Sequence, residues 1–357
     1  MRIAIDARCV NAEHLTGIER MVVRILEHWP SGGPECVAYV ERPVKWSFPN
    51  CTVRILRAPH PALWSQVALP LALRRDRIDT FVSPVTSLPL LLPPHITKAV
   101  VVYDLGYLAY PQFYSATERR ILNGRVRRSI LRSDIVIADS HFTAQDVIDR
   151  LRVPATRVRP IQLAMDPPLA ETPLPKGFDT TRPYLLTVGT AYGRKNLGIV
   201  VPALKTLIEK YHLDIDVVMT GKKGFAEQSI LDAAQAQGVS DRIHHLGFVT
   251  DNEKAALMRH AAAFFFPSLY EGFGIPVLEA MQYGCPVVCS NASSLPEVAG
   301  DAALLFDPND PNAAADAISQ LLNTPTLRAQ YIERGYRNVQ RFSWEKTTDQ
   351  FVAALTE

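Results

Sequence analysis

Several features that would place the chain in a specialised class of protein are rare or missing in its sequence. Five cysteines, an odd number among 357 residues, lack the paired spacing of a zinc site and predict buried free thiols. No apolar run approaches the roughly 18 residues of a membrane-spanning helix, and the richest stretch, Leu88–Leu92, is broken by proline. The opening Met1–Asp6 is typical of a strand and lacks the basic start and long apolar stretch of a signal peptide. We therefore expect a cytoplasmic protein in a reducing setting.

The composition predicts ordinary globular domains. Hydrophobic residues make up 47% of the chain and charged residues 21%, which argues against a disordered protein. A chain of 357 residues exceeds what one hydrophobic core usually organises, so two domains are expected.

The two halves differ in charge. Residues 1–165 contain 22 Lys+Arg and 14 Asp+Glu, whereas residues 166–357 contain 16 and 22. The basic residues of the first half are almost all arginine, which binds phosphate bidentately, so an anionic partner of this half is one interpretation. A solvated surface is the other. No helix-turn-helix, finger or aromatic-basic strand pattern supports nucleic acid as that partner.

Short apolar segments alternate with amphipathic ones in both halves, which predicts doubly wound α/β domains. The strands expected in the first half are Arg2–Asp6, Glu35–Val40, Thr52–Leu56, Thr80–Val82, Lys98–Tyr103 and Asp134–Ala138, with helices over Gly17–Glu27, Trp64–Arg75, Ala116–Arg132 and Phe142–Arg150. Those in the second half are Tyr184–Val188, Ile215–Met219, Ile243–Leu246, Ala262–Pro267 and Pro286–Cys289, with helices over Leu197–Glu209, Glu227–Gln237, Asn252–His260 and Pro276–Tyr283.

A proline-rich stretch separates the halves and predicts a linker over 166–182. It divides the chain into a first domain, 1–165, and a second domain, 183–342. Two such domains joined by a hinge would leave a cleft, and ligands bind beyond the carboxyl ends of the strands in sheets of this kind.

The segment from Ser268 to Glu279 carries the strongest chemical pattern. A strand ends, a loop with Gly272 and Gly274 follows, and Pro276 suits the first turn of a helix. Amides at such a helix start bind phosphate, here those of Phe273, Gly274 and Ile275. Glu279 could accept hydrogen bonds from a ribose diol, and Glu271 would face the group beyond the phosphates. The alternative is that both glutamates only cap and solvate the helix.

A second pattern follows the strand Tyr184–Val188. Gly189 ends this strand, and Arg194 and Lys195 come just before the next helix, where two cations suit a diphosphate leaving group. Ordinary surface charge is the alternative. Gly221, followed by Lys222 and Lys223, repeats the pattern after another strand, with an exposed turn as the alternative. Gly247 and Phe248 end a further strand that could meet a nucleotide base.

The first domain contributes fewer candidates. Thr16 and Gly17 form a turn before the first helix, which is either an anion site or a plain helix start. Asp104 follows the strand Lys98–Tyr103 at a carboxyl edge, a position suited to a group that orients a sugar.

A basic amphipathic helix is expected over Ala116–Arg132. Its apolar residues recur every four positions and six arginines surround them. The segment Arg119–Arg132 either packs on the sheet with a solvated face or contacts anionic lipid at the inner face of the membrane.

These residues resemble those of the retaining glycosyltransferase family 4. The Glu271–Glu279 spacing is similar to its E-x7-E motif, and Gly193–Leu197 is similar to its diphosphate-binding turn. The segments Asn291–Leu305 and Phe342–Glu345 also resemble the family, as do Asp6–Arg8 and Tyr103-Asp104 in the first domain, though more thinly.

The resemblance implies the GT-B fold, with two Rossmann-like domains and a C-terminal helix, 343–357, that crosses back to complete the first domain. It implies that Arg194 and Lys195 hold the diphosphate, that Glu279 holds the ribose, and that Glu271 positions the sugar with nearby amides. The acceptor would bind the first domain, near the Thr16-Gly17 turn and Tyr103-Asp104. No cofactor and no metal are expected.

The chain departs from the family pattern at Tyr103, where the family commonly has histidine before Asp104. Either the phenol supplies the missing hydrogen bond, or Asp104 takes a larger part. Similar chains are often mannosyltransferases that use GDP-mannose in polysaccharide or O-antigen assembly. We therefore expect mannosyl transfer to a saccharide or lipid-linked saccharide. UDP-glucose, UDP-N-acetylglucosamine or rhamnosyl donors are alternatives, as are a nucleotide-sugar epimerase and a non-catalytic binding protein.

Overall fold

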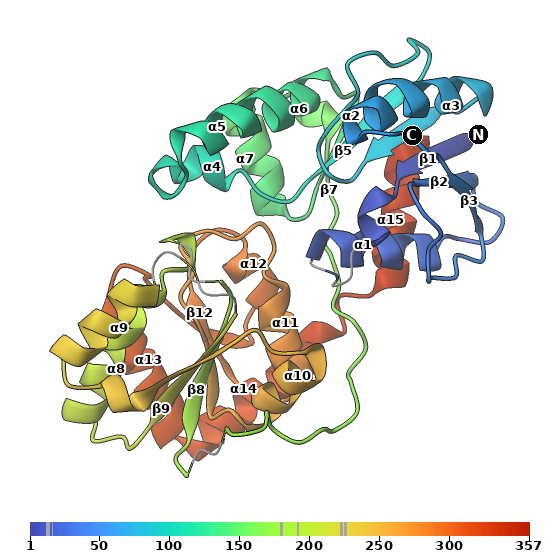
Figure 1. The fold of residues 1–357 in the computed structure, drawn as a ribbon. Coiled ribbons are helices and arrows are strands. Elements are labelled where there is room, and N and C mark those ends of the chain that lie inside the picture. Colours follow the sequence, from blue (N-terminus) through green and yellow to red (C-terminus); the bar gives the residue numbers. More distant parts are fainter. Residues whose placement is uncertain (12–14, 16, 179–180, 191–192, 222–223, 225–226) are drawn as a thin grey trace. The chain divides into compact units, whose positions relative to one another are not determined.

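The computed structural model describes residues 1–357 except 12–14, 16, 179–180, 191–192, 222–223 and 225–226. The chain forms two compact units (Figure 1). Unit 1 comprises Met1–Ala164 and Phe342–Glu357, and unit 2 comprises Met165–Arg341. The stretch predicted as a linker is therefore counted with unit 2, where the Leu169 amide donates to the Tyr283 hydroxyl (3.1 Å).

Unit 1 is built on a seven-stranded parallel sheet of order β3-β2-β1-β4-β5-β6-β7. Its strands are β1 (Arg2–Asp6), β2 (Glu35–Val40), β3 (Cys51–Ile55), β4 (Thr80–Ser83), β5 (Thr97–Val102), β6 (Ile135–Ala138) and β7 (Val158–Pro160). The inner strands are continuous apolar runs because helices cover both faces of a parallel sheet. The edge strand β3 is mostly exposed.

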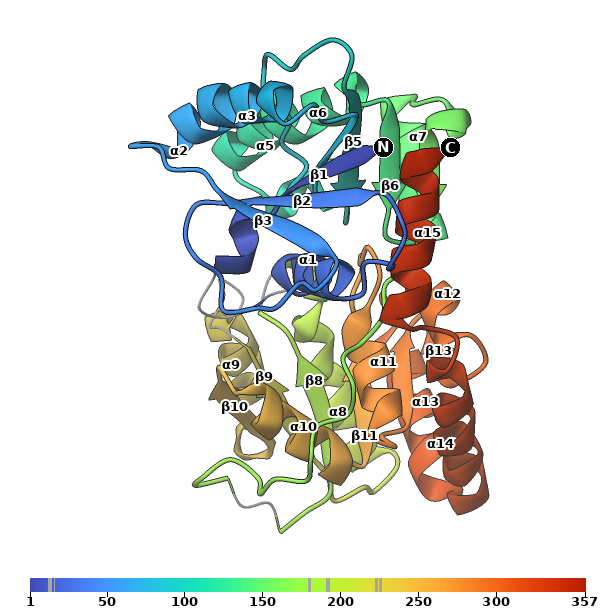
Figure 2. The ribbon, with the colours of Figure 1, turned by 90° about the vertical axis from the view of Figure 1, so that its right-hand side faces the viewer.

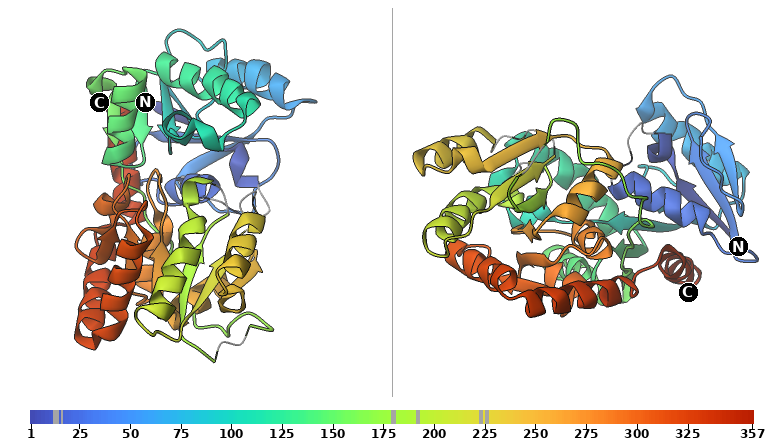
Figure 3. Two further views of the ribbon diagram at one scale, coloured as in Figure 1. Left: turned by 90° about the vertical axis from the view of Figure 1, so that its left-hand side faces the viewer. Right: turned by 90° about the horizontal axis from the view of Figure 1, so that it is seen from below.

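Helices cover the sheet of unit 1 (Figure 2). They are α1 (Gly17–Glu27), α2 (Pro61–Leu63), α3 (Leu69–Arg75), α4 (Gly106–Ala109), α5 (Ala116–Leu122), α6 (Arg128–Arg132), α7 (His141–Leu151) and α15 (Trp344–Thr356). A π-helical turn, Trp64–Ala68, joins α2 to α3, and another, Asn123–Arg127, joins α5 to α6. Helix α15 packs on β6 and α1, and both chain termini lie in unit 1 (Figure 3).

Unit 2 contains a six-stranded parallel sheet of order β10-β9-β8-β11-β12-β13. Its strands are β8 (Tyr184–Val188), β9 (Asp216–Thr220), β10 (Ile243–Gly247), β11 (Ala263–Phe266), β12 (Val287–Ser290) and β13 (Ala303–Phe306). This is the strand order of the dinucleotide-binding fold, with its topological switch point between β8 and β11.

Two layers of helices enclose the second sheet. The helices are α8 (Val200–Glu209), α9 (Glu227–Ala236), α10 (Asp251–His260), α11 (Ile275–Gln282), α12 (Leu295–Ala299), α13 (Pro311–Asn323) and α14 (Pro325–Val339). Apolar faces of α8, α9 and α13 share one buried core with the sheet. Figure 1 shows α10 and α11 on the opposite side.

The predicted α/β architecture is confirmed, and the expected strands and helices lie within a few residues of the observed ones. The patterns missed the short strands β7 and β13 and the helices α12 to α14. Among the residues that the structure describes, no helix has both the length and the apolar character needed to cross a bilayer.

Candidate donor-binding site

The carboxyl edge of the unit 2 sheet brings together most of the predicted residues. The loop after β8 carries Gly189, Arg194 and Lys195, and the loop after β11 carries Ser268–Gly274. Strands β8 and β11 are neighbours on either side of the switch point, where open sheets of this kind bind their ligands. The amide of Leu269 donates to the carbonyl of Arg194 (2.8 Å), so the two loops are directly joined.

Three consecutive strand ends are held together by glycines. The Gly189 amide donates to Thr220 O (2.8 Å), and the Gly221 amide donates to Gly247 O (2.8 Å). Gly189 has a φ of 145° and Gly221 a φ of 135°, which L side chains rarely adopt. A Cβ atom on Gly221 would lie 2.4 Å from Gly189 O, so these positions require glycine and leave backbone groups at the edge.

A buried ion group lies at the centre of this edge. Lys195 Nζ donates to Glu271 Oε1 (2.6 Å), and Arg194 Nη1 lies 3.2 Å from Glu271 Oε2 and donates to Tyr270 O (3.0 Å). Burial alone would raise the pKa of Glu271, but the charges of Lys195 and Arg194 outweigh it and lower the pKa below its ordinary value. Two cations against one carboxylate leave an excess positive charge for an anion to neutralise.

The position of the lysine is further restricted by two neighbours. Its ammonium lies 5.1 Å from the centre of the Phe266 ring, within cation–π range. Its methylene chain runs beside Gly189, where an added Cβ would lie 3.4 Å from Lys195 Cε. The ammonium is thus directed to the strand ends rather than to solvent.

The loop after β11 ends in a helix start that has no side-chain cap. Gly274 occupies the N-cap of α11 with a φ of 108°, and a Cβ there would lie 2.7 Å from Leu295 Cδ2. Within the described part of the chain, no group accepts a hydrogen bond from the amides of Gly274 and Ile275. Amides in this position form an anion site together with the helix dipole.

Two serines that the sequence patterns missed hold this loop in place. The Glu271 amide donates to Ser293 Oγ (2.9 Å), and buried Ser294 Oγ lies within hydrogen-bonding distance of the Glu271 and Phe273 carbonyls (3.1 and 2.7 Å). Both lie between β12 and α12, in the segment that resembles the family but had no assigned role. Ser293 has a φ of 55°, in the left-handed region.

Glu279 lies in the second turn of α11, and its contact is not with Lys195. Both carboxylate oxygens accept hydrogen bonds from Lys254 Nζ on α10, at 2.8 Å each. Lys254 also lies 3.4 Å from Asp251 Oδ1. No glycine loop or strand end marks Lys254 in the sequence, so this partner was not predicted.

The remaining candidates of unit 2 differ in exposure. Phe248 follows Gly247 at the end of β10 and is 59% exposed, which leaves its ring accessible to a flat ligand. Ser268 is buried, and its carbonyl accepts a hydrogen bond from Ser290 Oγ (2.5 Å). Gly272 lies in the loop between Glu271 and Gly274. Lys222 and Lys223 lie outside the described residues.

The described candidates of unit 1 lie on two segments, the start of α1 and the loop after β5. Thr16 lies outside the described residues, whereas Gly17 is exposed at the start of α1, with open space around its Cβ direction. The half-buried Tyr103 directs its hydroxyl at Met21 Sδ (3.3 Å) on α1. Burial raises the pKa of Tyr103 well above its ordinary value, and the nearby Cys9, Asp139 and Glu19 raise it further.

Asp104 lies two residues before a short helix and is held by the backbone there. Its Oδ1 accepts the Gly106 amide (2.9 Å) at the start of α4. A carboxylate already engaged by the backbone is held in one orientation, which suits a group that positions a ligand.

Comparisons with known proteins identify relatives of this chain. The family model "Glycosyl transferases group 1" matches residues 171–338. The chain is 31% identical over 271 residues to O-antigen chain mannosyltransferase B of Escherichia coli, which covers 74% of this chain and 71% of that protein.

Solved structures of glycosyltransferases share the fold. The sucrose-phosphate synthase from Thermosynechococcus elongatus superposes with a TM-score of 0.73 at 20% identity, covering 98% of this chain and 97% of that one. Anabaena Alr3699/HepE, solved with UDP and glucose, superposes with a TM-score of 0.68 at 16% identity, covering 100% and 99%.

Proposed function

The chain belongs to the glycosyl transferases group 1 family and is a glycosyltransferase, and from this premise we propose that it transfers mannose from GDP-mannose to a saccharide or lipid-linked saccharide. The observation that carries the proposal is the ion group of Lys195, Arg194 and Glu271 beside the uncapped start of α11. It lies at the switch point of a dinucleotide-type sheet, where a nucleotide ligand is expected.

The diphosphate would bind to the cations and to the helix start. Lys195 and Arg194 carry charge toward it, and the amides of Gly274 and Ile275 offer fixed dipoles. The interactions of the diphosphate with the cations and with the amides strengthen as negative charge grows on the leaving nucleoside diphosphate. They therefore stabilise the transition state more than the bound donor, and this lowers the barrier to departure. The glycine edge would let the phosphates approach the backbone closely.

The two glutamates would have separate tasks. Glu271, fixed by Lys195 and by Ser293, would position the transferred sugar together with the amides of Phe273 and Gly274. Glu279 would accept hydrogen bonds from the ribose hydroxyls. The exposed ring of Phe248 would lie against the base.

The reaction would retain the anomeric configuration. The glycosidic bond to the diphosphate breaks through an oxocarbenium-like transition state, and the acceptor hydroxyl attacks from the same face. Its proton passes to the departing phosphate oxygen, so no separate base is required. Because the pKa of Tyr103 is raised, its phenol stays protonated and can act only as a neutral hydrogen-bond partner. The expectation that no metal takes part stays a prediction.

Mannose is favoured as the sugar because a relative that matches 74% of this chain is named a mannosyltransferase. A UDP-sugar donor is the second candidate, since the structural neighbour from Anabaena was solved with UDP and glucose. The test is product analysis with GDP-mannose and UDP-glucose against free and lipid-linked acceptors. Mannosylated product from GDP-mannose supports the proposal, and product from UDP-glucose alone overturns the choice of donor.

Two outcomes would point to other activities. Release of nucleoside diphosphate without any acceptor would indicate an epimerase. Donor binding with neither transfer nor release across the acceptor panel would indicate a binding protein. A calorimetric comparison of GDP, UDP and dTDP identifies the base independently of turnover.

A further inference from the structure

One face of unit 1 exposes large apolar side chains in a number that folding does not explain. Leu91 is 80% exposed and Leu71 is 63% exposed. Four further residues, between 36% and 50% exposed, lie on the same or adjoining segments: Leu63, Val67, Leu90 and Leu131. We call these six residues the leucine surface. They come from three segments, namely the helix 61–75, the loop between β4 and β5, and the end of α6.

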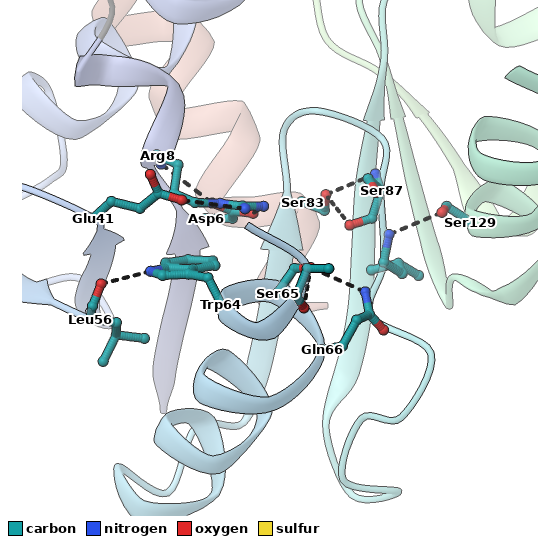
Figure 4. Close-up of polar contacts among 12 residues, drawn as sticks. Asp6, Arg8, Glu41, Leu56, Trp64, Ser65, Gln66, Ser83, Ser87 and Ser129 are labelled. Carbon is teal, nitrogen blue, oxygen red and sulfur yellow. Dashed lines mark hydrogen bonds and ion pairs between the residues drawn. The ribbon is translucent and has the colours of Figure 1, made fainter. Parts of the chain in front are cut away.

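Hydrogen bonds show that these three segments adjoin one another. The Leu90 amide donates to Gln66 Oε1 (2.7 Å) on the π-helical turn before α3. Arg132 Nη2 on α6 donates to Leu90 O (2.7 Å), and the Leu88 amide donates to Ser129 Oγ (3.0 Å), also on α6. Figure 4 shows Gln66 and Ser129 on either side of the loop. The exposed leucines therefore belong to one surface.

The loop that carries Leu90 and Leu91 is firmly anchored. Leu88 is buried, and Leu92 packs against the core of unit 1. Prolines 89, 93 and 94 restrict the backbone on both sides. In Figures 1 and 2 this loop, in cyan, projects beyond the helices of unit 1. The structure thus holds two leucines outward at a projecting tip. Exposing them to water is unfavourable, and nothing in the described part of unit 1 offsets this, so a partner that covers them is expected.

The segments that carry the leucine surface, and the helix that leads into it, are rich in arginine. Residues 61–75, 84–96 and 116–132 together contain eight arginines and one acidic residue, Glu118. Glu118 is engaged in a capping box with Ser115. Within the described residues, Arg75 pairs with Asp76, and the other seven arginines make no ion pair: Arg74, Arg119, Arg120, Arg125, Arg127, Arg128 and Arg132. The basic segment Arg119–Arg132 noted in the sequence therefore borders an apolar tip.

We propose that this surface docks on an anionic lipid bilayer, with Leu90 and Leu91 entering the interface and the arginines contacting lipid phosphates. A membrane offers hydrocarbon beneath negatively charged headgroups. The exposed leucines match the hydrocarbon, and the arginines, with almost no carboxylates among them, match the headgroups. A second copy of the chain fits poorly, because a symmetric contact would bring arginines against arginines. Nucleic acid would match the arginines but leave the leucines without a partner.

The test is co-sedimentation of the full chain with vesicles of phosphatidylcholine alone and with phosphatidylglycerol added, without any acceptor lipid. We expect binding only to the anionic vesicles, and loss of binding as salt is raised. The double variant Leu90→Ser/Leu91→Ser should bind at least about tenfold more weakly, since it removes two apolar side chains from the interface. Its backbone hydrogen bonds to Gln66 and Arg132 are retained.

The matched control is Leu231→Ser/Leu305→Ser, which changes two leucines of unit 2 with 39% exposure each and should leave binding unchanged. Equal affinity of the wild type for neutral and anionic vesicles, or no binding to either, would overturn the proposal. So would equal losses in the two double variants. Sedimentation velocity that shows a dimer dispersed by the Leu90/Leu91 change, with no vesicle binding, would assign the surface to self-association. Donor binding by the same variant separates this outcome from any failure of the transferase proposal.

Discussion

The two sheets of this protein share a strand order but carry opposite chemistry at their carboxyl edges. In unit 2, the described residues at the switch point between β8 and β11 include two cations against one carboxylate, with glycines beside them. In unit 1, among the described residues, Arg8 after β1 lies 2.7 Å from Asp6 at the end of β1 and 3.8 Å from Glu41 just after β2, so one cation faces two carboxylates. The same topology therefore offers a cationic edge in one unit and an acidic edge in the other.

The side chains at the unit 1 edge also fill it. Arg8 lies 4.1 Å from the ring centre of the buried Trp64, whose Nε1 donates to Leu56 O (2.8 Å), as Figure 4 shows. An edge occupied by a tryptophan and two carboxylates suits neutral hydroxyl groups better than phosphate. The difference teaches that strand order determines where a ligand can bind, whereas the loop residues determine which charge of ligand the site accepts.

The strongest test of this comparison removes the cation of unit 2. Lys195→Ala should lower kcat by about 100- to 1000-fold, because the leaving diphosphate loses a charge that acts most in the transition state. The measurement is steady-state transfer, with circular dichroism to check the fold. Lys205→Ala, an exposed lysine of α8 in the same unit, is the control and should retain full turnover. Normal kcat in Lys195→Ala would refute the role assigned to the unit 2 edge.

A second test concerns the ribose. Glu279→Ala should weaken GDP binding by about 10- to 100-fold, since hydrogen bonds to a charged group contribute roughly 1.5 to 3 kcal/mol. In the variant, 2′-deoxy-GDP and GDP should bind alike, whereas the wild type should prefer GDP. Calorimetry measures both. A variant that keeps the wild-type preference would show that Glu279 only pairs with Lys254.

The cation of unit 1 should behave differently from that of unit 2. Arg8→Met should lower the free energy of unfolding by about 1 to 3 kcal/mol, because it leaves the buried Asp6 carboxylate without its main partner. Donor affinity should change less than twofold. Thermal denaturation and nucleotide titration together test this. A loss of donor affinity as large as that of Lys195→Ala would show that the cations of the two units do not differ in function.

Acid should affect the ion group of unit 2 in a defined direction. The pKa of Glu271 is lowered in the folded protein, so its carboxylate stabilises the fold above the unfolded value of about 4.3. That stability is lost as pH falls through the lower, folded pKa. When the pH is lowered from 5 through the folded pKa of Glu271, the Tm of Glu271→Gln should therefore fall less than the Tm of the wild type. Parallel acid profiles would mean that the pair contributes nothing to stability.

The smallest effect is expected at Tyr103. Tyr103→Phe removes only the hydroxyl that lies near Met21, and we expect kcat to fall about tenfold or less, as for the loss of one neutral hydrogen bond. Because the pKa of this phenol is raised, the ratio of wild-type to variant kcat should stay constant up to at least pH 9. If the ratio of wild-type to variant kcat changed near neutral pH, a group other than the Tyr103 phenol would have to titrate in that range.

The sequence located the unit 2 edge because its pattern is local. Each candidate segment follows directly on a strand, and the structure places the strands that end at Val188 and Phe266 side by side, so that Lys195 and Glu271 meet. Ser293, Ser294 and Lys254 could not be predicted, because their positions depend on how α10 and α12 pack against the loop and no turn or glycine marks them. The short strand β13 was missed because Leu304 and Leu305 give only a brief apolar run.

The most direct test of the central claim is a calorimetric comparison of GDP, GMP and guanosine with the wild type and with Lys195→Ala. If the lysine grips the diphosphate, the wild type should bind GDP at least tenfold more tightly than GMP, and the variant should lose most of that preference while binding guanosine unchanged. A variant that retains the full preference for GDP would contradict the account.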